Sequence, residues 1–355
     1  MELLHPYFHN KNDIDLYIRV DASPNIGMGH LSRCLAIAKH AKKSGFNVTF
    51  LSESITVTER ASASNFLFKK LNRSQFIEEE IPEVRKILEK GSSGKRVLLI
   101  DTYQITEDYV SAFADIAKIV YLGSKQITSE SIDLLINYSC TAKKDFYTQY
   151  CPNSKLCLGI QYAPLGEEFW IKQKPCFNSS NRILITAGGS DAVNITYSIL
   201  DSLTKEARLS SYIFEAIIGP LNPHRTLLID TFSKKKNIKL RVNEKEMAKR
   251  MDNCICAISA SGTTLYELTA KRVPTIAFAL NAEQEPDAKG FRDLGLLHYS
   301  GSLNSLSIDS LVNNIKEDLI FILSSNEELE KINKRQSKLL PENGTEKIIT
   351  AIKNL

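Results

Sequence analysis

The residues best suited to chemistry follow a short apolar run near the start of the chain. Segment 21–30 reads Asp-Ala-Ser-Pro-Asn-Ile-Gly-Met-Gly-His and separates a predicted strand from a predicted helix. Gly27 and Gly29 would let the backbone turn tightly and leave amides facing a ligand. His30 would lie at the helix start, where the positive helix end disfavours the protonated imidazole and favours the neutral form that a general base requires. Alternatively, His30 caps the helix or packs against it.

A second candidate loop lies in the other half of the chain. Segment 186–191 reads Thr-Ala-Gly-Gly-Ser-Asp, ends a predicted strand and leads through Asn194 towards a helix. Paired glycines followed by Ser190 and Asp191 make a capped helix entrance with several unpaired amides, which suits a phosphate group. A plain tight turn would have the same composition.

A third loop, 259–267, reads Ser-Ala-Ser-Gly-Thr-Thr-Leu-Tyr-Glu and also brings small residues from a strand end into a helix. Glu267 would lie about one turn into that helix, where its carboxylate could accept hydrogen bonds from a ribose diol. A solvated helix glutamate is the alternative. Taken together, the three loops describe a diphosphate held on one domain and a reactive group on another.

The elements that must position these loops alternate along the chain. Short apolar, β-branched runs recur with amphipathic helical stretches between them, as in right-handed βαβ units of a parallel sheet. The clearest helix carries Leu31, Cys34, Leu35 and Ala38 on one face and stops at Gly45. The predicted strands are 16–21, 48–52, 97–101, 119–122 and 133–137, and then 182–187, 214–219, 238–242, 254–259 and 274–279.

Two such series predict an α/β protein with two Rossmann-like domains whose parallel sheets face a central cleft. We expect an N-terminal domain over 1–165, carrying His30, and a C-terminal domain over 166–355, carrying the two loops suited to a diphosphate. Segment 166–181, with mixed composition and poor periodicity, is the predicted linker. Terminal helices are expected from Ser307 onward, one of them packing back on the first domain.

Composition limits the function classes. The 355 residues carry 45 basic and 41 acidic side chains interspersed along the chain, so no concentrated basic field favours nucleic acid as a partner. No apolar run approaches the roughly 20 residues of a membrane span, and the first residues lack a signal-peptide pattern, so we expect a cytoplasmic protein. Seven cysteines without paired CxxC motifs fit neither a disulfide framework nor a zinc site. Cys254 and Cys256 fall on alternate positions of an apolar strand, as core residues do.

The motifs resemble those of the PseG/SpsG group of UDP-sugar hydrolases, relatives of the MurG-type glycosyltransferases with the GT-B fold. The matching pieces run in family order over most of the chain. They are 21–33 (DASPNIGMGHLSR), 100–103 (IDTY), 133–137 (DLLIN), 159–165 (GIQYAPL) with Glu168 and Phe169, 188–191 (GGSD) with Asn194, 258–267 (ISASGTTLYE) and 281–284 (NAEQ).

The resemblance implies hydrolysis of UDP-2,4-diacetamido-2,4,6-trideoxy-L-altrose to UDP and free sugar, in pseudaminic acid and hence polysaccharide biosynthesis, with water attacking the anomeric carbon. His30 matches the family's catalytic histidine, and Tyr103 matches a tyrosine that hands on a proton or holds the sugar. No cofactor or metal is implied, and we expect a monomer whose partner is the small-molecule substrate. The residues implied to bind substrate are Asp21, Gly27, Gly29, Gly188, Gly189, Ser190, Asp191, Asn194, Ser259, Ser261, Gly262, Thr263, Glu267, Asn281 and Gln284.

Two other functions fit the same loops. A GT-B glycosyltransferase would use His30 to deprotonate an acceptor hydroxyl, and a membrane-linked acceptor would favour exposed apolar and basic residues on the first domain, of which the sequence shows no strong patch. A catalytically silent nucleotide-sugar binding subunit would gain little from a titratable group at position 30. The hydrolase interpretation also requires that the imidazole lies neither buried in a core nor far from the gap between the two domains. The family often has a histidine where this chain has Thr102, so the resemblance does not define the sugar.

Overall fold

The computed structural model describes residues 14–21, 29–91, 94–171 and 180–355, and these form two compact units. Unit 1 comprises residues up to 166 together with 343–355, and unit 2 comprises residues 167–342. The predicted boundary at 165/166 differs from this division by one residue. The predicted C-terminal domain ran to residue 355, whereas the last 13 residues lie in unit 1 because their apolar face packs into the core of unit 1.

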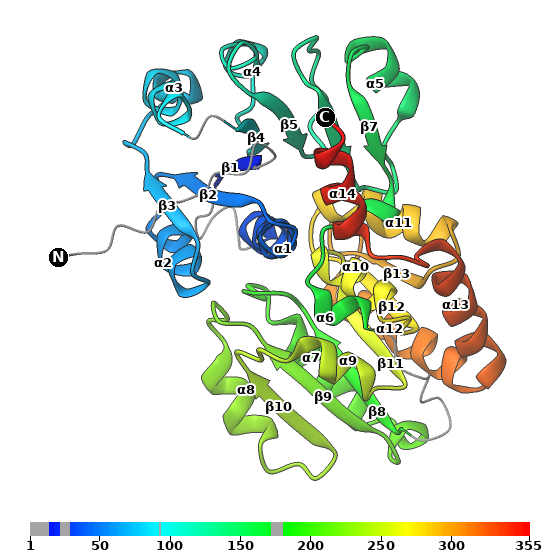
Figure 1. Cartoon of the computed structure of the whole chain (residues 1–355). Helices are drawn as coiled ribbons and strands as arrows, with labels where there is room; N and C mark the ends of the chain where they lie inside the picture. Colours follow the sequence, from blue (N-terminus) through cyan, green and yellow to red (C-terminus); the bar gives the residue numbers. More distant parts are fainter. Residues whose placement is uncertain (1–13, 22–28, 92–93, 172–179) are drawn as a thin grey trace. The chain divides into compact units, whose positions relative to one another are not determined.

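Unit 1 is built on a seven-stranded sheet in the order β3-β2-β1-β4-β5-β6-β7, and every neighbouring pair is parallel (Figure 1). Its strands are β1 (Ile14–Val20), β2 (Asn47–Ser52), β3 (Leu67–Lys70), β4 (Lys95–Asp101), β5 (Lys118–Leu122), β6 (Leu134–Asn137) and β7 (Lys155–Leu158). Its helices are α1 (Gly29–Lys43), α2 (Ile55–Ala63), α3 (Ile81–Glu89), α4 (Glu107–Ser111), α5 (Lys144–Tyr150) and α14 (Gly344–Lys353), with short 3₁₀ turns at Ile77–Glu80 and Ile160–Tyr162.

Helix α1 confirms the clearest sequence prediction. Leu31, Cys34 and Ala38 are fully buried on its inner face, and Gly45 adopts φ +86° just past its end, a conformation that glycine reaches without steric cost. Helix α14 lies beside α1 and completes the core on this side of the sheet with Ile348, Ile349 and Ile352 (Figure 1, red beside blue). The expectation that one terminal helix returns to the first domain is therefore met by α14.

Unit 2 contains a six-stranded sheet in the order β10-β9-β8-β11-β12-β13, again wholly parallel. Its strands are β8 (Arg182–Thr186), β9 (Ile213–Ile218), β10 (Ile238–Val242), β11 (Cys256–Ala260), β12 (Thr275–Ala279) and β13 (His298–Ser302). Its helices are α6 (Glu167–Trp170), α7 (Ile195–Thr204), α8 (Arg225–Phe232), α9 (Met247–Asp252), α10 (Thr263–Ala270), α11 (Glu285–Asp293), α12 (Ile308–Leu323) and α13 (Asn326–Leu339), with 3₁₀ turns at Ala207–Leu209 and Ala282–Gln284.

Both sheets have the alternation of strand and helix that the apolar periodicity predicts. All ten predicted strands are present, and β3, β7 and β13 are additional. Cys254 and Cys256 are buried, as a core position requires. Part of the predicted linker, 172–179, lies outside the described residues, and α6 occupies positions that the prediction left without structure.

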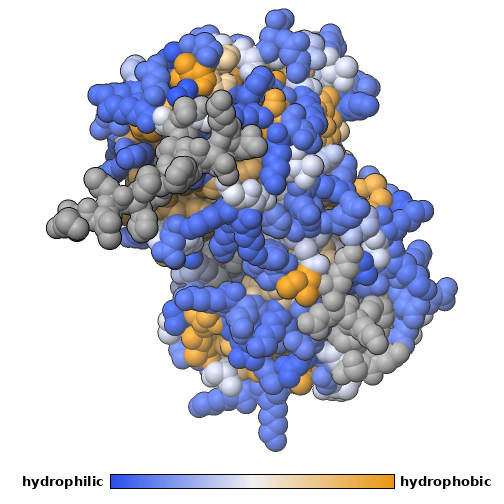
Figure 2. All heavy atoms as spheres, in the orientation of Figure 1, coloured by the Kyte–Doolittle hydropathy of each residue, from blue (hydrophilic) through white to orange (hydrophobic). Residues whose placement is uncertain are grey.

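The surface mixes apolar and hydrophilic side chains. On the face drawn in Figure 2, apolar side chains form small separate patches among hydrophilic ones. None of the described helices is both long and apolar enough to cross a membrane.

Candidate active site

In unit 1 the candidate chemistry collects at the carboxyl ends of two neighbouring strands, β1 and β4. Asp21 directly follows β1, Asp101 ends β4, and Tyr103 lies two residues beyond it. Helix α1 begins at Gly29, and His30 is its second residue. The predicted ligand Gly27 lies outside the described residues.

His30 is held by a carboxylate. Its Nδ1 lies 2.5 Å from Oδ1 of Asp101, and the Asp101 side chain is completely buried. Because an ionised carboxylate only accepts hydrogen bonds, this contact places the imidazole proton on Nδ1 and leaves the lone pair on Nε2. Nε2 is itself buried and has no hydrogen-bond partner among the described residues. A buried polar atom of this kind normally marks a position for water or a ligand.

The surroundings of His30 are polar, although only 5% of the residue is exposed. The ring of Tyr103 lies edge-on to the imidazole with 4.6 Å between ring centroids, and Tyr103 is 60% exposed. The imidazole is therefore buried, with the Asp101 carboxylate in contact with one side and the exposed Tyr103 ring with another. Within the described residues, Nδ1 contacts Asp101 and Nε2 has no partner, so neither ring nitrogen caps α1 there.

Asp101 was not predicted as a site residue, and neither was Arg33. The Arg33 guanidinium donates to both oxygens of Asp101, with Nε 2.7 Å from Oδ2. Burial alone would raise the pKa of the Asp101 carboxyl, but the charge and hydrogen bonds of Arg33 and His30 hold that pKa below its usual value. Asp101 is therefore an anion beside the imidazole at any working pH. Its position at the end of a strand in the IDTY motif was the available signal.

Asp21 has a second network of its own. Its carboxylate accepts from Arg19 and from the Thr102 hydroxyl. Arg19 in turn forms a two-point ion pair with buried Glu80, with Nε–Oε1 at 2.6 Å and Nη2–Oε2 at 3.0 Å. Both oxygens of Asp21 are thus already engaged, which ties the end of β1 to Thr102 after β4.

In unit 2 the predicted residues follow three adjacent strands, β8, β11 and β12. Gly188, Gly189 and Ser190 are exposed after β8, Gly262 and Thr263 follow β11, and Asn281 and Gln284 follow β12. Because the carboxyl ends of parallel strands share one edge of a sheet, these loops lie together at that edge. The two loops that the sequence analysis placed together on one domain, 186–191 and 259–267, both follow strands of this sheet.

Several of these side chains already have structural partners. The Asp191 carboxylate accepts from the amides of Ile195 (2.8 Å) and Thr196 (3.1 Å), so it caps the N-terminus of α7, the entrance that the sequence analysis expected to be capped. The hydroxyl of Ser261 donates to Phe278 O at 2.8 Å, and that of Ser259 to Ala260 O at 2.9 Å. Asn194, in the left-handed region at φ 56°, has a buried Oδ1 without a partner in the described part of the chain.

The N-terminus of α10 is the more open helix end. Its N-cap is exposed Gly262, and no side chain caps it. Glu267 lies one turn further, where burial, and then the neighbouring charge of Glu168, raise the pKa of its carboxyl to about 7. After β12, Asn281 Oδ1 accepts from the Gln284 amide and Gln284 Oε1 accepts from the Leu280 amide, so both side chains are held in the loop.

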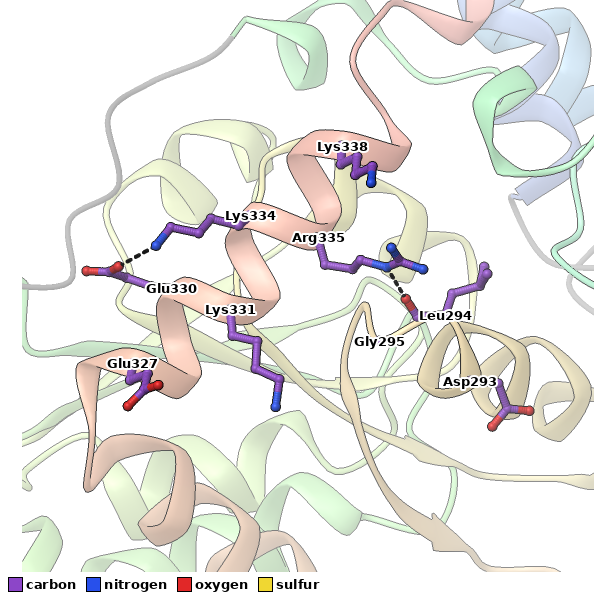
Figure 3. Close-up of a pocket in the computed structure, with 9 residues that line it drawn as sticks. All are labelled: Asp293, Leu294, Gly295, Glu327, Glu330, Lys331, Lys334, Arg335 and Lys338. Carbon is purple, nitrogen blue, oxygen red and sulfur yellow. Dashed lines mark hydrogen bonds and ion pairs between the residues drawn. The ribbon is translucent and has the colours of Figure 1, made fainter.

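A groove of about 640 Å³ elsewhere in unit 2 contains none of the predicted residues. It lies between α13 and the end of α11 (Figure 3). Lys334 is paired with Glu330 at 2.9 Å, and Arg335 donates to Leu294 O at 2.8 Å. Because its lining holds none of the residues singled out for chemistry, it is a weaker candidate than the strand ends. In the described residues, no group of three His, Cys, Asp or Glu is arranged to hold a metal ion.

Comparisons with known proteins bear on both fold and chemistry. The chain is 25% identical over 288 residues to the Helicobacter pylori protein named pseudaminic acid cytidylyltransferase and UDP-2,4-diacetamido-2,4,6-trideoxy-beta-L-altropyranose hydrolase, covering 80% of this chain and 47% of that protein. It is 25% identical to the Campylobacter jejuni UDP-2,4-diacetamido-2,4,6-trideoxy-beta-L-altropyranose hydrolase, covering 75% of this chain and 92% of that one. The spore coat polysaccharide biosynthesis protein SpsG of Bacillus subtilis is 27% identical over 140 residues, covering 39% of this chain and 40% of that protein.

The resemblance to the PseG/SpsG group is confirmed by these relatives. The chain spans about half the length of the Helicobacter protein and of an uncharacterized Methanocaldococcus jannaschii protein that it also matches. No protein-family model matches the chain.

Solved structures establish the fold. Acinetobacter baumannii MurG has a TM-score of 0.65 at 12% identity, with 97% of this chain and 100% of that chain covered. A UDP-GlcNAc 2-epimerase from Neisseria meningitidis has the same TM-score at 15% identity and the same coverage. The chain thus has the α/β fold with two parallel sheets of the GT-B glycosyltransferases.

Proposed function

We propose that this chain hydrolyses a UDP-2,4-diacetamido-2,4,6-trideoxy sugar, releasing UDP and the free sugar for pseudaminic acid biosynthesis. Two of its relatives carry that activity in their names. The observation that carries the proposal is the state of His30: Nδ1 is committed to Asp101, while Nε2 has its lone pair available and no partner among the described residues. This is the arrangement of an oriented general base.

The proposed reaction is a single displacement at the anomeric carbon. His30 Nε2 takes a proton from a water molecule as the water oxygen bonds to C1. The bond between C1 and the β-phosphate oxygen breaks, and its electron pair leaves with UDP. The imidazolium formed is stabilised by the Asp101 carboxylate on the opposite nitrogen. Tyr103, exposed beside the ring, is the proposed group that holds the sugar or passes on a proton.

Unit 2 is the proposed UDP-binding unit. The uncapped N-terminus of α10 offers amides to the diphosphate, and the helix dipole favours its negative charge. The exposed Gly188 to Ser190 turn at the neighbouring strand end offers further amides. Glu267, one turn into α10, is the proposed acceptor for the ribose hydroxyls, with Asn281 and Gln284 nearer the sugar. No cofactor is part of this proposal.

The test is UDP release from a panel of UDP-2,4-diacetamido sugars, with and without candidate acceptor alcohols. We expect UDP and free sugar in equal amounts without any acceptor. UDP release that depends on an acceptor would instead identify a glycosyltransferase that uses the same base. Tight UDP binding without turnover of any donor would identify a binding subunit, and either result would overturn the proposal.

A further inference from the structure

Arg33 has no assigned role in the proposed reaction, although it is built into the same cluster as the imidazole. On α1 it lies three residues after His30, and Cys34 follows it, so all three side chains extend from one face of the helix. All three reach Asp101: His30 through Nδ1, Arg33 through Nε and Nη2, and Cys34 through Sγ at 3.2 Å. One buried carboxylate therefore contacts three side chains from about one turn of α1.

Arg33 is itself held in place. Its Nη1 donates to the Tyr138 hydroxyl at 2.8 Å, and its guanidinium carbon lies 5.6 Å from the centre of the Tyr138 ring. Tyr138 directly follows β6, so the guanidinium is fixed between two strand ends of the sheet. Only 12% of its side chain is exposed. A planar guanidinium fixed on two sides makes a directional ion pair rather than a mobile surface charge.

The contact between Arg33 and His30 determines what this ion pair does. Arg33 Nη2 lies 3.1 Å from His30 Nδ1. A guanidinium can only donate, and Nδ1 already donates to Asp101. The contact therefore brings two N–H donors together, and their partial positive charges repel each other. A carboxylate without another partner stabilises a neighbouring imidazolium. Here the Asp101 carboxylate is already paired with the Arg33 guanidinium, and this positive charge disfavours a second one on His30.

The other titratable groups around His30 leave this balance unchanged. Burial, and then the charge of Asp101, raise the pKa of the Cys34 thiol well above its usual value, so Cys34 is a neutral donor. Asp21 is paired with Arg19. Tyr103 contacts the imidazole through its ring, and Tyr138 accepts from Arg33.

We propose that Arg33 is a positioning residue that keeps His30 as the neutral Nδ1–H tautomer, so that Nε2 acts as a base. The proposal rests on His30 being the base of the proposed function, but the state of the imidazole can be measured without any substrate. If Arg33 were only a structural anchor for Asp101, replacing it would lower stability without changing the protonation of the imidazole in the folded protein.

The experiment is a pH titration of the full chain by ¹⁵N NMR of its histidine side chains, with His30→Gln to assign the His30 signals. Nitrogen shifts report both tautomer and protonation. In Arg33→Met we expect the midpoint of the His30 titration to rise by about one pH unit or more, because an opposing positive charge is lost. In Asp101→Asn we expect the midpoint to fall and the Nδ1–H preference to weaken.

Two milder variants keep the test decisive should Arg33→Met fold poorly. Arg33→Lys retains the charge, so its His30 midpoint should stay close to that of the parent. Tyr138→Phe removes the hydroxyl that holds Arg33, so its midpoint should rise by less than in Arg33→Met. Unchanged midpoints in both Arg33→Met and Tyr138→Phe, or an unchanged midpoint in Tyr138→Phe if Arg33→Met does not fold, would overturn the proposal.

Activity then separates this proposal from the function. If the chain hydrolyses a UDP-sugar, the acidic limb of its pH–rate profile should move to higher pH in Arg33→Met, in parallel with the NMR midpoint. If no UDP-sugar is hydrolysed but the midpoints move as stated, the proposed function fails while the role of Arg33 holds.

Discussion

At the scale of single residues, the candidate base depends on a partner 71 positions away in the sequence. His30 and Asp101 belong to different motifs, and they meet because β1 and β4 are neighbours in the sheet. The sequence predicted His30 at a helix start, but it could not supply the strand order that brings Asp101 to Nδ1. The same reason explains why Arg33 was read only as part of a motif.

Replacement of His30 is the direct test at this scale. His30→Ala should reduce turnover by roughly 100-fold or more while UDP affinity stays nearly unchanged, because the imidazole acts on water and the UDP loops lie in unit 2. Steady-state kinetics and calorimetry with UDP measure the two effects. His40→Gln, near the other end of α1, is the matched control and should behave as the parent. Full activity in His30→Ala would remove the imidazole from the mechanism.

Glu267 gives a prediction about stability and pH. The pKa of its carboxyl is about 7 in the folded chain, above the ordinary value of 4.5, so the folded state binds the extra proton between these two values. The protonated Glu267 side chain causes no loss of folding stability below pH 4.5. As pH rises through 7 the carboxyl must ionise inside the folded chain, and the free energy of unfolding falls. Glu267→Gln should be more stable than the parent at pH 8, with a difference that shrinks towards pH 5.

Thermal unfolding of the parent and Glu267→Gln at the two pH values checks this. Glu283→Gln, an exposed carboxylate in the 3₁₀ turn after β12, is the control and should show no such pH-dependent difference. A Glu267→Gln effect of the same size at pH 5 and pH 8 would show that the carboxyl is not titrating in this range.

At the scale of elements, the interior of each sheet could be predicted and its edges largely could not. The three strands absent from the prediction, β3, β7 and β13, are all edge strands. β3 reads Leu-Phe-Lys-Lys with three of its four residues exposed, and β13 contains Gly301 at φ +125°. An edge strand buries too little surface to need a continuous apolar run, so the signal that marks central strands is weak there.

The sequence predicts a capped entrance to α7, and in the structure the cap is Asp191. Because Asp191 caps two amides of α7, Asp191→Ala should destabilise the chain by about 1–2 kcal/mol. Asp191→Asn, which keeps an acceptor oxygen, should lose less. Denaturant unfolding measures both. If Asp191 instead contacted the diphosphate, Asp191→Ala would change UDP affinity with little change in stability, and the capping role would be refuted.

At the scale of the whole molecule, the two units have separate cores, and the chain enters unit 1 twice. Residues from the first strand to 166 build its sheet, and α14 returns after unit 2 to cover α1. The apolar face of α14 predicts that this helix must be buried, but the pattern does not specify against which sheet. The packing of Ile348, Ile349 and Ile352 in the core of unit 1, where α14 contacts α1, β6 and the turn at Ile160–Tyr162, makes that choice.

This architecture predicts which unit each substitution weakens. Ile352 is fully buried in the core of unit 1, so Ile352→Ala should cost about 2–5 kcal/mol there, although residue 352 follows all of unit 2 in the sequence. The only tryptophan, Trp170, lies in unit 2 and reports on that unit by fluorescence, whereas far-UV circular dichroism reports on both.

In Ile352→Ala we expect the dichroism transition at a lower temperature or denaturant concentration than in the parent and an unchanged Trp170 transition. Phe321→Ala, at a 52% exposed position of α12, should leave both transitions nearly unchanged. If the Trp170 transition of Ile352→Ala moves together with the dichroism transition, the two cores unfold as one cooperative body. The assignment of α14 to unit 1 would then not predict which unit a substitution destabilises.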